Sequence, residues 1–323
     1  MKNVFDLWPA LDLRQLAAFD AVAQTGSFAQ AAKRLGYTQP AVSHQLATLE
    51  RLVGHRLIDR TSGRNWATLT PAGRVFARHA ATLASGLAAL RGDLEALAAG
   101  DSAVLRVGAF QSVSARILPP LLQELAAAAP RLSVELAESA DESELLAGLA
   151  DGSLDFAFVL LPIEDEQFEA VELLSDPFCL VGAAGDADAL AIGSLRDLAD
   201  VPLVAPRTCR SWAVIESKLR EAGVEPRYAF RTDDNLALKA LVQRRAGLAF
   251  LSELTLELIG DGLATAPADR FVPPRRLALA WHGARTQIPH RQLFVDLAQR
   301  ICRTVPATAA PRRPASRLAR AGR

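Results

Sequence analysis

A short polar stretch near the N-terminus has side chains suited to reading a nucleic acid. Residues 38–45, Thr-Gln-Pro-Ala-Val-Ser-His-Gln, place hydroxyl, amide and imidazole groups within about two helical turns of one another. Such groups can hydrogen-bond to base edges in the major groove of DNA, where each base pair presents a distinct pattern. The candidate DNA-contacting residues of this kind are Thr38, Gln39, Pro40, Ser43, His44 and Gln45, with Ser27 upstream.

Positively charged residues lie on both sides of this stretch. The candidates for phosphate contacts are Lys33, Arg34, Arg51, Arg60 and Arg64. Arginine and lysine at phosphates add affinity without carrying sequence information. On residue type alone, the same positions are also compatible with an ordinary solvated surface.

The charge is distributed unevenly, although the 323-residue chain has a formal net charge of zero. Residues 1–100 contain 11 lysines and arginines against 7 acidic residues, whereas residues 101–305 contain 20 against 29. A basic front followed by an acidic body indicates that the front approaches a polyanion. Residues 306–323 add five arginines and no acid. We expect them to form a disordered basic tail that either adds phosphate contacts or solubilises the terminus.

Three short helices are needed to position the polar stretch. Apolar residues recur at helical spacing over residues 13–23, and a second helix is predicted over residues 28–35 behind a Ser27 cap. Residues 38–40 open a third helix, because a hydroxyl N-cap and a first-turn proline favour initiation, and this helix stops at Gly54. A glycine-bearing turn between the last two helices makes the pattern typical of a helix-turn-helix.

A hairpin and a long helix are predicted next. Residues 60–70 indicate a β-hairpin with its tip near Ser62-Gly63, which would form a wing. After Thr70-Pro71, apolar residues repeat with alternating spacings of four and three, which is typical of a coiled coil. The predicted dimerisation residues are Phe76, Leu83, Leu87, Leu90, Leu94 and Leu97. The alternative is an amphipathic helix that packs on its own domain.

From Val104 onward, predicted strands alternate with predicted helices. The strands are expected at residues 104–109, 132–138, 154–160, 178–183, 201–205, 228–231, 247–251 and 277–281. The helices are expected at about residues 114–128, 142–150, 195–199, 211–222, 234–245, 253–260 and 290–303. Such alternation predicts parallel βαβ units with ligands at the carboxyl ends of strands.

Several ordered motifs in the N-terminal part resemble the signature of LysR-type transcriptional regulators. They are Leu13-Arg14-Gln15-Leu16-Ala17-Ala18-Phe19, Gly26-Ser27-Phe28-Ala29-Gln30-Ala31-Ala32, Thr38-Gln39-Pro40-Ala41-Val42-Ser43 and Leu69-Thr70-Pro71-Ala72-Gly73. Weaker landmarks continue to about Arg303 and include Leu154-Asp155-Phe156-Ala157 and Gly247-Leu248-Ala249. The chain departs from the family pattern at Leu57-Ile58, where a Leu-Phe pair is usual, and its hairpin is about two residues longer than usual.

The resemblance implies a mixed α+β and α/β protein in several parts. These are a winged helix-turn-helix over residues 11–70, a dimerising linker helix over 71–100 and a two-lobed effector domain of the type 2 periplasmic-binding-protein fold over 104–303. The implied function is sequence-specific transcription regulation of the LysR type, with a small metabolite bound between the lobes. The implied partners are double-stranded promoter DNA, further copies of the chain in a dimer or tetramer, and RNA polymerase.

A candidate effector site follows from the resemblance and, in part, from the residues themselves. The implied residues are Gln111, Ser112, Ser114, Ser139, Leu160, Arg207, Thr208, Thr232 and Asp233. Ser112 and Ser114 precede a predicted helix, where free N–H groups and the helix dipole favour an anion, and Arg207 with Arg210 would add a bidentate clamp. A small, anionic, partly apolar effector is expected. The alternative is that both serines cap the helix and both arginines pair with surface acids.

Other functions find little support in the sequence. The five histidines form no HExxH motif, and no GxSxG, Walker A or complete GxGxxG is present, so neither an enzyme nor a metal or cofactor site is expected. Three cysteines are too few for a disulfide framework, and no long apolar window occurs, so we expect a cytoplasmic protein without a membrane partner. The remaining rival is a DNA-binding repressor whose rear domain serves only oligomerisation.

Overall fold

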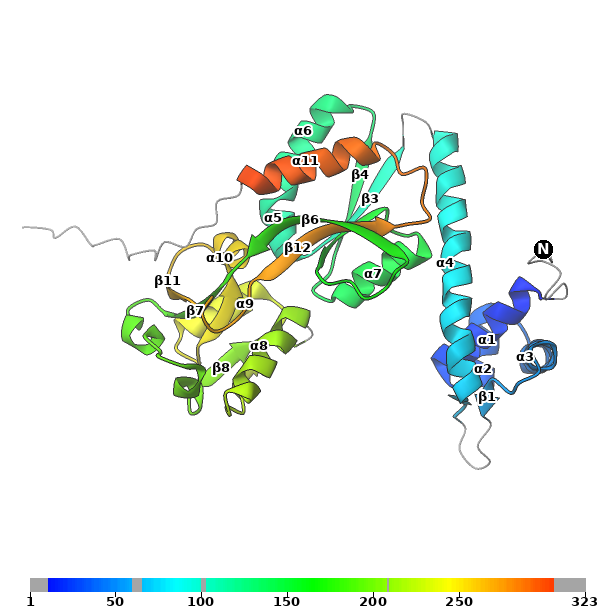
Figure 1. Ribbon diagram of the computed structural model, residues 1–323, viewed down its shortest axis with the longest axis horizontal. Coiled ribbons are helices and arrows are strands. Elements are labelled where there is room, and N and C mark those ends of the chain that lie inside the picture. The colour runs from blue at the N-terminus through cyan, green and yellow to red at the C-terminus, as the bar shows by residue number, and fades with distance from the viewer. Residues whose placement is uncertain (1–10, 60–65, 100–102, 208, 305–323) are drawn as a thin grey trace, which may run out of the picture. The chain divides into compact units, whose positions relative to one another are not determined.

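The computed structural model describes residues 11–59, 66–99, 103–207 and 209–304, which form two compact units (Figure 1). The first unit ends at Leu87 and the second begins at Ala88, within the helix α4 (Pro71–Ala99). Each unit therefore contains one part of this helix. The predictions for Arg60, Arg64, Thr208 and the tail at 306–323 lie outside the described residues.

The first unit consists of helices and a short antiparallel hairpin. In chain order its elements are α1 (Leu13–Thr25), α2 (Phe28–Leu35), α3 (Gln39–Val53), β1 (Ile58–Asp59), β2 (Thr68–Leu69) and the N-terminal part of α4. The three predicted helices are confirmed, and α1 is about two residues longer than predicted. Side-chain oxygens of Asp12, Ser27 and Thr38 accept hydrogen bonds from the first turns of these helices, which satisfies N–H groups that have no partner within the helix.

The core of the first unit determines which face of α3 points outward. Val42, Leu46 and Leu49 are fully buried and pack in one cluster with Phe19 and Val22 of α1. Their spacing of three and four residues places them on one face of the helix. The polar residues of α3 therefore lie on the faces that the core does not use.

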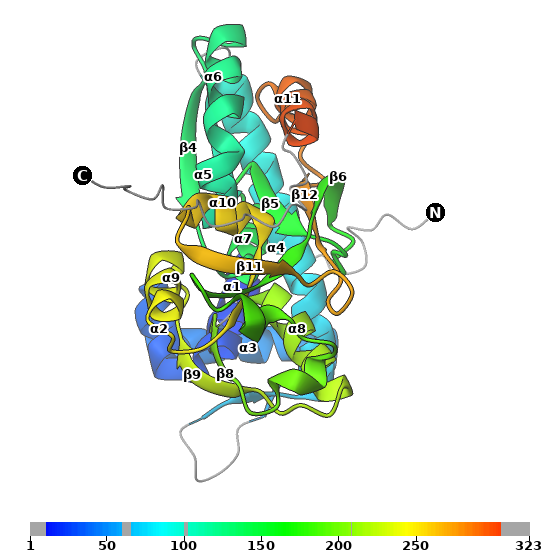
Figure 2. The ribbon, with the colours of Figure 1, turned by 90° about the vertical axis from the view of Figure 1, so that its left-hand side faces the viewer.

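The second unit contains a first lobe built on a mixed sheet with the strand order β4-β3-β5-β12-β6. The strands are β3 (Val104–Ala109), β4 (Ser133–Glu138), β5 (Phe156–Leu160), β6 (Phe168–Asp176) and β12 (Arg275–His282). The helices are α5 (Gln111–Arg116), α6 (Leu118–Ala128), α7 (Glu142–Asp151) and α11 (Arg291–Thr304). Helices α6 and α11 lie side by side (Figure 2), and their apolar faces share one core with β3, β5 and β12.

The second lobe is inserted between β6 and β12. It contains the antiparallel sheet β10-β7-β11 and the parallel pair β8-β9. The strands are β7 (Phe178–Ala183), β8 (Pro202–Ala205), β9 (Arg227–Arg231), β10 (Ala249–Ser252) and β11 (Leu263–Pro267). The helices are α8 (Arg210–Glu221), α9 (Asn235–Gln243), α10 (Glu253–Ile259) and two 3-10 turns, Ala187–Leu190 and Leu195–Leu198. The chain thus passes between the lobes once after β6 and once before β12.

Three expectations about the second unit need correction. Parallel pairing is right for β4-β3-β5 and β8-β9 but wrong for β12 and β7, because β12 re-enters the first sheet from the other lobe and runs antiparallel to β5 and β6. The predicted helix at 114–128 is two helices, since Pro119 and Pro120 cannot donate the hydrogen bonds that would continue α5. Strands β6 and β11 were not predicted, because one is rich in acidic residues and the other is short and ends in proline.

Candidate DNA-binding surface and effector site

The predicted base-reading residues lie at the exposed start of α3. Gln39, Pro40 and His44 are exposed, whereas Ser43 and Gln45 are half-buried. Thr38 is exposed and accepts a hydrogen bond from the Ala41 N–H at 3.4 Å, as the helix cap. The first two turns of α3 therefore present hydroxyl, amide and imidazole groups outward, as a recognition helix requires.

The base of the wing is fixed against the helices by two contacts. Glu50 of α3 accepts hydrogen bonds from the backbone N–H groups of Leu57 at 2.8 Å and Ile58 at 3.1 Å. On the other strand, the Ala67 N–H donates to the Gly26 carbonyl at 2.7 Å, and the Trp66 indole lies against Gly26. The hairpin is thus held to both α3 and the turn between α1 and α2.

The candidate phosphate-binding residues differ in their contacts. Lys33 and Arg51 are exposed. Arg34 donates a hydrogen bond to Gln24 and lies 4.0 Å from Asp20, so its charge is already shared within the first unit. Ser27, also a candidate, accepts from the Gln30 N–H at 3.4 Å as the cap of α2. The DNA contacts of all four residues remain predictions.

The apolar repeat of α4 divides into two parts. Phe76 is half-buried and packs edge-on against Phe19, with ring centroids 5.0 Å apart, so it belongs to the core of the first unit as in the alternative prediction. The other predicted dimerisation residues form an exposed stripe with 44–64% of their surface accessible; they are Leu83, Leu87, Leu90, Leu94 and Leu97. A row of five exposed leucines needs an apolar partner.

A cavity of about 300 Å³ lies between the two lobes of the second unit. Its apolar wall includes Phe110, Phe178, Trp212, Leu238 and Phe250. Among the predicted effector residues it is lined by Gln111, Ser112, Ser139, Thr232 and Asp233. The remaining described candidates, Ser114, Leu160 and Arg207, do not line this cavity. Of the eight predicted effector residues that the structure describes, it therefore brings five together.

The two serines do not cap helix α5, and their contact with an effector stays a prediction. Both lie inside the six-residue helix α5, whose N-cap is Phe110 without a side-chain hydrogen bond. Ser114 donates to the Phe110 carbonyl at 3.2 Å, and Ser112 accepts from the guanidinium of Arg275 at 2.9 Å. Neither serine precedes the helix, because helix α5 starts about three residues earlier than predicted.

Arg275 lines the cavity and was not predicted. It opens β12 and forms an ion pair of 2.5 Å with Asp176, the last residue of β6; the two side chains are 10% and 1% exposed. The other oxygen of Asp176 accepts from the Leu254 N–H at 3.1 Å. Arg275 thus ties both crossover strands to α5 through Ser112. The sequence does not indicate that Arg275 is buried, because it lies at the start of a strand and next to a second arginine, Arg276.

The N-terminus of α8 faces the same cavity without a side-chain cap. Its N-cap Cys209 makes no capping hydrogen bond, and Cys209, Ser211 and Trp212 all line the cavity. Ser211 is 7% exposed, and within the described part of the chain its hydroxyl oxygen has no hydrogen-bond partner. A buried hydroxyl without a partner costs free energy unless a bound group completes it. An uncapped helix N-terminus favours a negatively charged group.

The two arginines predicted to form a clamp make hydrogen bonds to other residues of the second unit. Arg210 donates from lobe two to Glu142 and to the Leu160 carbonyl, both at 2.9 Å, and to the Pro162 carbonyl at 2.6 Å. Arg207 donates its backbone N–H to Asp233 at 2.7 Å and its side chain to the Arg231 carbonyl. The alternative of pairing with acids thus holds for Arg210, although Glu142 is buried rather than on the surface.

A further hydrogen bond crosses between the lobes. The Asn235 side chain donates to Gln111 at 2.6 Å, joining the first residues of α9 and α5. Together with the contacts of Arg210 and the ion pair between Arg116 of α5 and Glu257 of α10, it joins the two lobes by polar contacts.

The cysteines do not form a redox pair in the structure. Cys179 and Cys302 are buried, and burial raises their thiol pKa values to about 11 and about 12. All three cysteines are free. Within the described residues, no group of three His, Cys, Asp or Glu side chains could hold a metal ion. No helix in the same part of the chain is long and apolar enough to span a membrane.

Comparison with protein families accounts for both units. Residues 13–74 match the bacterial regulatory helix-turn-helix protein, lysR family, and residues 98–303 match the LysR substrate binding domain. The chain belongs to the LysR family. It is therefore a DNA-binding transcriptional regulator with an effector-binding domain rather than an enzyme. The predicted family and fold class are confirmed.

Relatives of this LysR-family chain match it over most of their length. A probable hydrogen peroxide-inducible genes activator of Streptomyces viridosporus is 30% identical over 89% of this chain and 93% of its own. The SDS degradation transcriptional activation protein of a Pseudomonas species is 36% identical over 72% of this chain and 76% of its own. Among solved structures, full-length CbnR complexed with target DNA is 28% identical, with a TM-score of 0.54 over 90% of this chain and all of that chain.

Proposed function

We propose that this LysR-family regulator binds promoter DNA as a homo-oligomer and responds to a small anionic, partly apolar effector held between its lobes. The DNA contacts would come from the start of α3 and from the wing. The likeness to CbnR, whose solved structure contains its target DNA, supports this part of the proposal. The presence of activators among the relatives supports contact with RNA polymerase.

The observation that carries the effector proposal is the unpaired hydroxyl of Ser211 beside the uncapped start of α8. A carboxylate there would accept hydrogen bonds from this hydroxyl and from free backbone N–H groups of the first turn. The apolar wall formed by Phe178, Trp212 and Phe250 would hold a hydrocarbon or aromatic body. The ligand class that fits is a small monocarboxylate with an apolar body.

A rear domain that served only for oligomerisation is less well supported. Such a domain would gain nothing from a hollow between its lobes that leaves a buried polar group unsatisfied.

We assign oligomerisation itself to the exposed stripe on α4. Two such stripes from two copies would bury each other in a coiled coil, and Leu94→Asp, which places a charge in the seam, should convert the protein to monomers in light scattering.

The effector proposal is tested by thermal unfolding of the full-length protein with phenylacetate and hexanoate, using the matching amides as controls. A ligand that binds only the folded state raises the melting temperature by mass action. We expect a carboxylate-specific rise in the wild type that Ser211→Ala diminishes, and a matched Ser217→Ala on the exposed part of α8 should not. Equal effects of acids and amides would contradict the anionic class, and no effect of either would contradict the site.

A further inference from the structure

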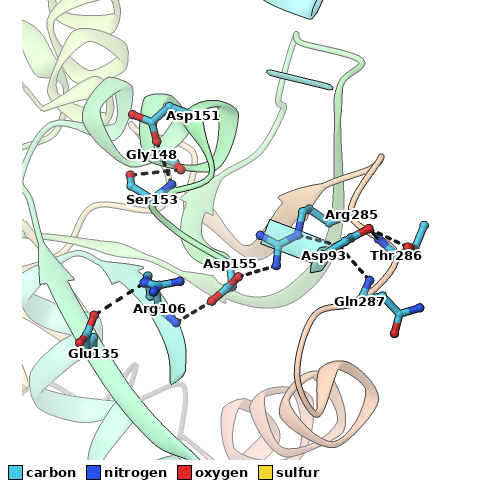
Figure 3. Close-up of polar contacts among 10 residues, drawn as sticks. All are labelled: Asp93, Arg106, Glu135, Gly148, Asp151, Ser153, Asp155, Arg285, Thr286 and Gln287. Carbon is cyan, nitrogen blue, oxygen red and sulfur yellow. Dashed lines mark hydrogen bonds and ion pairs between the residues drawn. The ribbon is translucent and has the colours of Figure 1, made fainter. Parts of the chain in front are cut away.

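We propose that Arg285 is a positioning residue that fastens the second half of α4 to the first lobe. Arg285 is 4% exposed and forms ion pairs with Asp93 of α4 at 3.0 Å and with Asp155 at 2.9 Å (Figure 3). A buried guanidinium between two carboxylates has both its charge and its fork of donors satisfied. Loss of either partner would leave a buried charge without full compensation.

On the helix side, the carboxylate of Asp93 is saturated by one loop. It accepts from Arg285 at 3.0 Å, from the backbone and hydroxyl of Thr286 at 2.9 and 2.7 Å, and from the Gln287 N–H at 3.0 Å. The neighbouring Gly92 permits this approach, because a Cβ there would lie 2.6 Å from Arg285 Nη1. The helix and the loop are thus in close contact through both side chain and backbone.

On the lobe side, Asp155 connects Arg285 to the middle of the sheet. Its side chain is 3% exposed and also accepts from the backbone N–H of Arg106 on β3 at 2.8 Å. Strand β5 begins at the next residue, Phe156. The helix is therefore anchored to the two neighbouring strands β3 and β5, which are central to the first lobe.

The same loop is continuous with the wall of the effector cavity. Strand β12 starts at Arg275, which lines the cavity, and ends at His282, three residues before Arg285. Residues 277–280 of this strand are fully buried between β5 and β6. The inference rests on the proposed function in one respect: the exposed leucines at 90, 94 and 97 lie on the fastened half of α4. A displacement of the first lobe would carry this part of the pairing stripe with it.

Two glycine substitutions on one helix test the attachment in the full-length protein by hydrogen–deuterium exchange. Gly92→Ala drives a methyl group into Arg285, whereas Gly86→Ala meets nothing within 4 Å. Both changes favour the helix intrinsically. We expect Gly92→Ala to raise amide exchange over residues 88–99 at least tenfold and Gly86→Ala to leave it unchanged or slower. Equal, slow exchange in both variants would overturn the proposal.

A second variant keeps the test decisive if Gly92→Ala perturbs the whole domain, which would appear as faster exchange in β5. Asp93→Asn preserves the shape of the side chain and removes its charge. Asp93→Asn should also raise amide exchange over residues 88–99 while β5 stays protected. Exchange over residues 88–99 at the wild-type rate would overturn the proposal. Neither exchange measurement requires DNA or an effector. If the proposed ligand class fails, the exchange result for α4 is unaffected. If the attachment of α4 fails, the thermal-unfolding test of the ligand still holds.

Discussion

Arg275 donates a hydrogen bond of 2.9 Å to Ser112, and through this contact the start of β12 is joined to the helix that borders the effector cavity. Because the same guanidinium is paired with the buried Asp176, the cavity wall, the outgoing crossover and the returning crossover share one charged group. A ligand near Ser112 therefore lies next to the segments about which the lobes would move.

Removing this group should destabilise the second unit strongly. Arg275→Ala leaves Asp176 buried without its counter-charge, and we expect a loss of about 3–5 kcal/mol in the free energy of unfolding. The adjacent Arg276 pairs with Glu172 at the surface, where both partners are about half exposed. Arg276→Ala should cost less than about 1 kcal/mol. Urea unfolding of both variants measures the difference, and similar losses would contradict the assigned burial.

The contact between Gly26 and Trp66 gives a prediction for the wing. A Cβ at Gly26 would lie 2.5 Å from the Trp66 indole, and the backbone is left-handed there, with φ of 62°. Gly36 has a similar φ of 69° but open space around it. Gly36→Ala should therefore cost about 1 kcal/mol from backbone strain alone, and Gly26→Ala should cost more. Adding Trp66→Ala should recover part of the excess; no recovery would show that the indole is not the obstacle.

Two substitutions on α3 should separate base reading from phosphate binding. Gln39 lies in the first turn, so Gln39→Ala should reduce the preference for the operator over random DNA by about 1–3 kcal/mol. Arg51 lies in the last turn, so Arg51→Ala should weaken all duplexes alike and reduce the slope of log affinity against log salt by about 1. Fluorescence anisotropy at several salt concentrations measures both effects. Identical changes in the two variants would argue against this docking orientation.

The attachment of α4 should depend on pH in a defined direction. Burial raises the pKa of Asp93, but hydrogen bonds from Thr286, Gln287 and Arg285 outweigh it and hold the pKa below its ordinary value. The stabilisation is therefore present above about pH 4, the pKa in the unfolded chain, and is lost as the pH falls through the lower folded value. The stability gap between wild type and Asp93→Asn should narrow on acidification. Glu95→Gln, at an exposed pair with Arg91, should show little gap at any pH.

The helices were more accessible to sequence reasoning than the site. Caps at Ser27 and Thr38 and the buried spacing of Val42, Leu46 and Leu49 are local signals, and the structure agrees with them within one or two residues. The strands of the second unit were mostly placed as well. The parallel direction was predicted correctly for β4-β3-β5 and β8-β9 but not for β12, because its reversal results from the whole lobe that is inserted between β6 and β12.

The effector site shows the same limit. Gln111, Thr232 and Asp233 were found through the family resemblance, whereas Arg275 and Ser211 were missed. A buried arginine cannot be distinguished in sequence from its exposed neighbour Arg276, since only the fold brings Asp176 to it. Arg210 was expected to hold a ligand for the same reason: the distance to Glu142, 68 positions away along the chain, is set by tertiary structure.

Because Phe76 packs against Phe19, the first turns of α4 belong to the core of the helix-turn-helix unit. The exposed leucines begin only at Leu83. The seven positions from Phe76 to Leu83 set the angle about the α4 axis between the packed face and the leucine stripe, because each residue of an α-helix adds 100° of rotation and 1.5 Å of rise. One alanine inserted there would rotate the packed face of α4 by about 100° relative to the leucine stripe, without changing the residues of either. In the proposed dimer, variants of this kind would favour operators with a different spacing between half-sites. The length of this segment would then help to set which operators are bound.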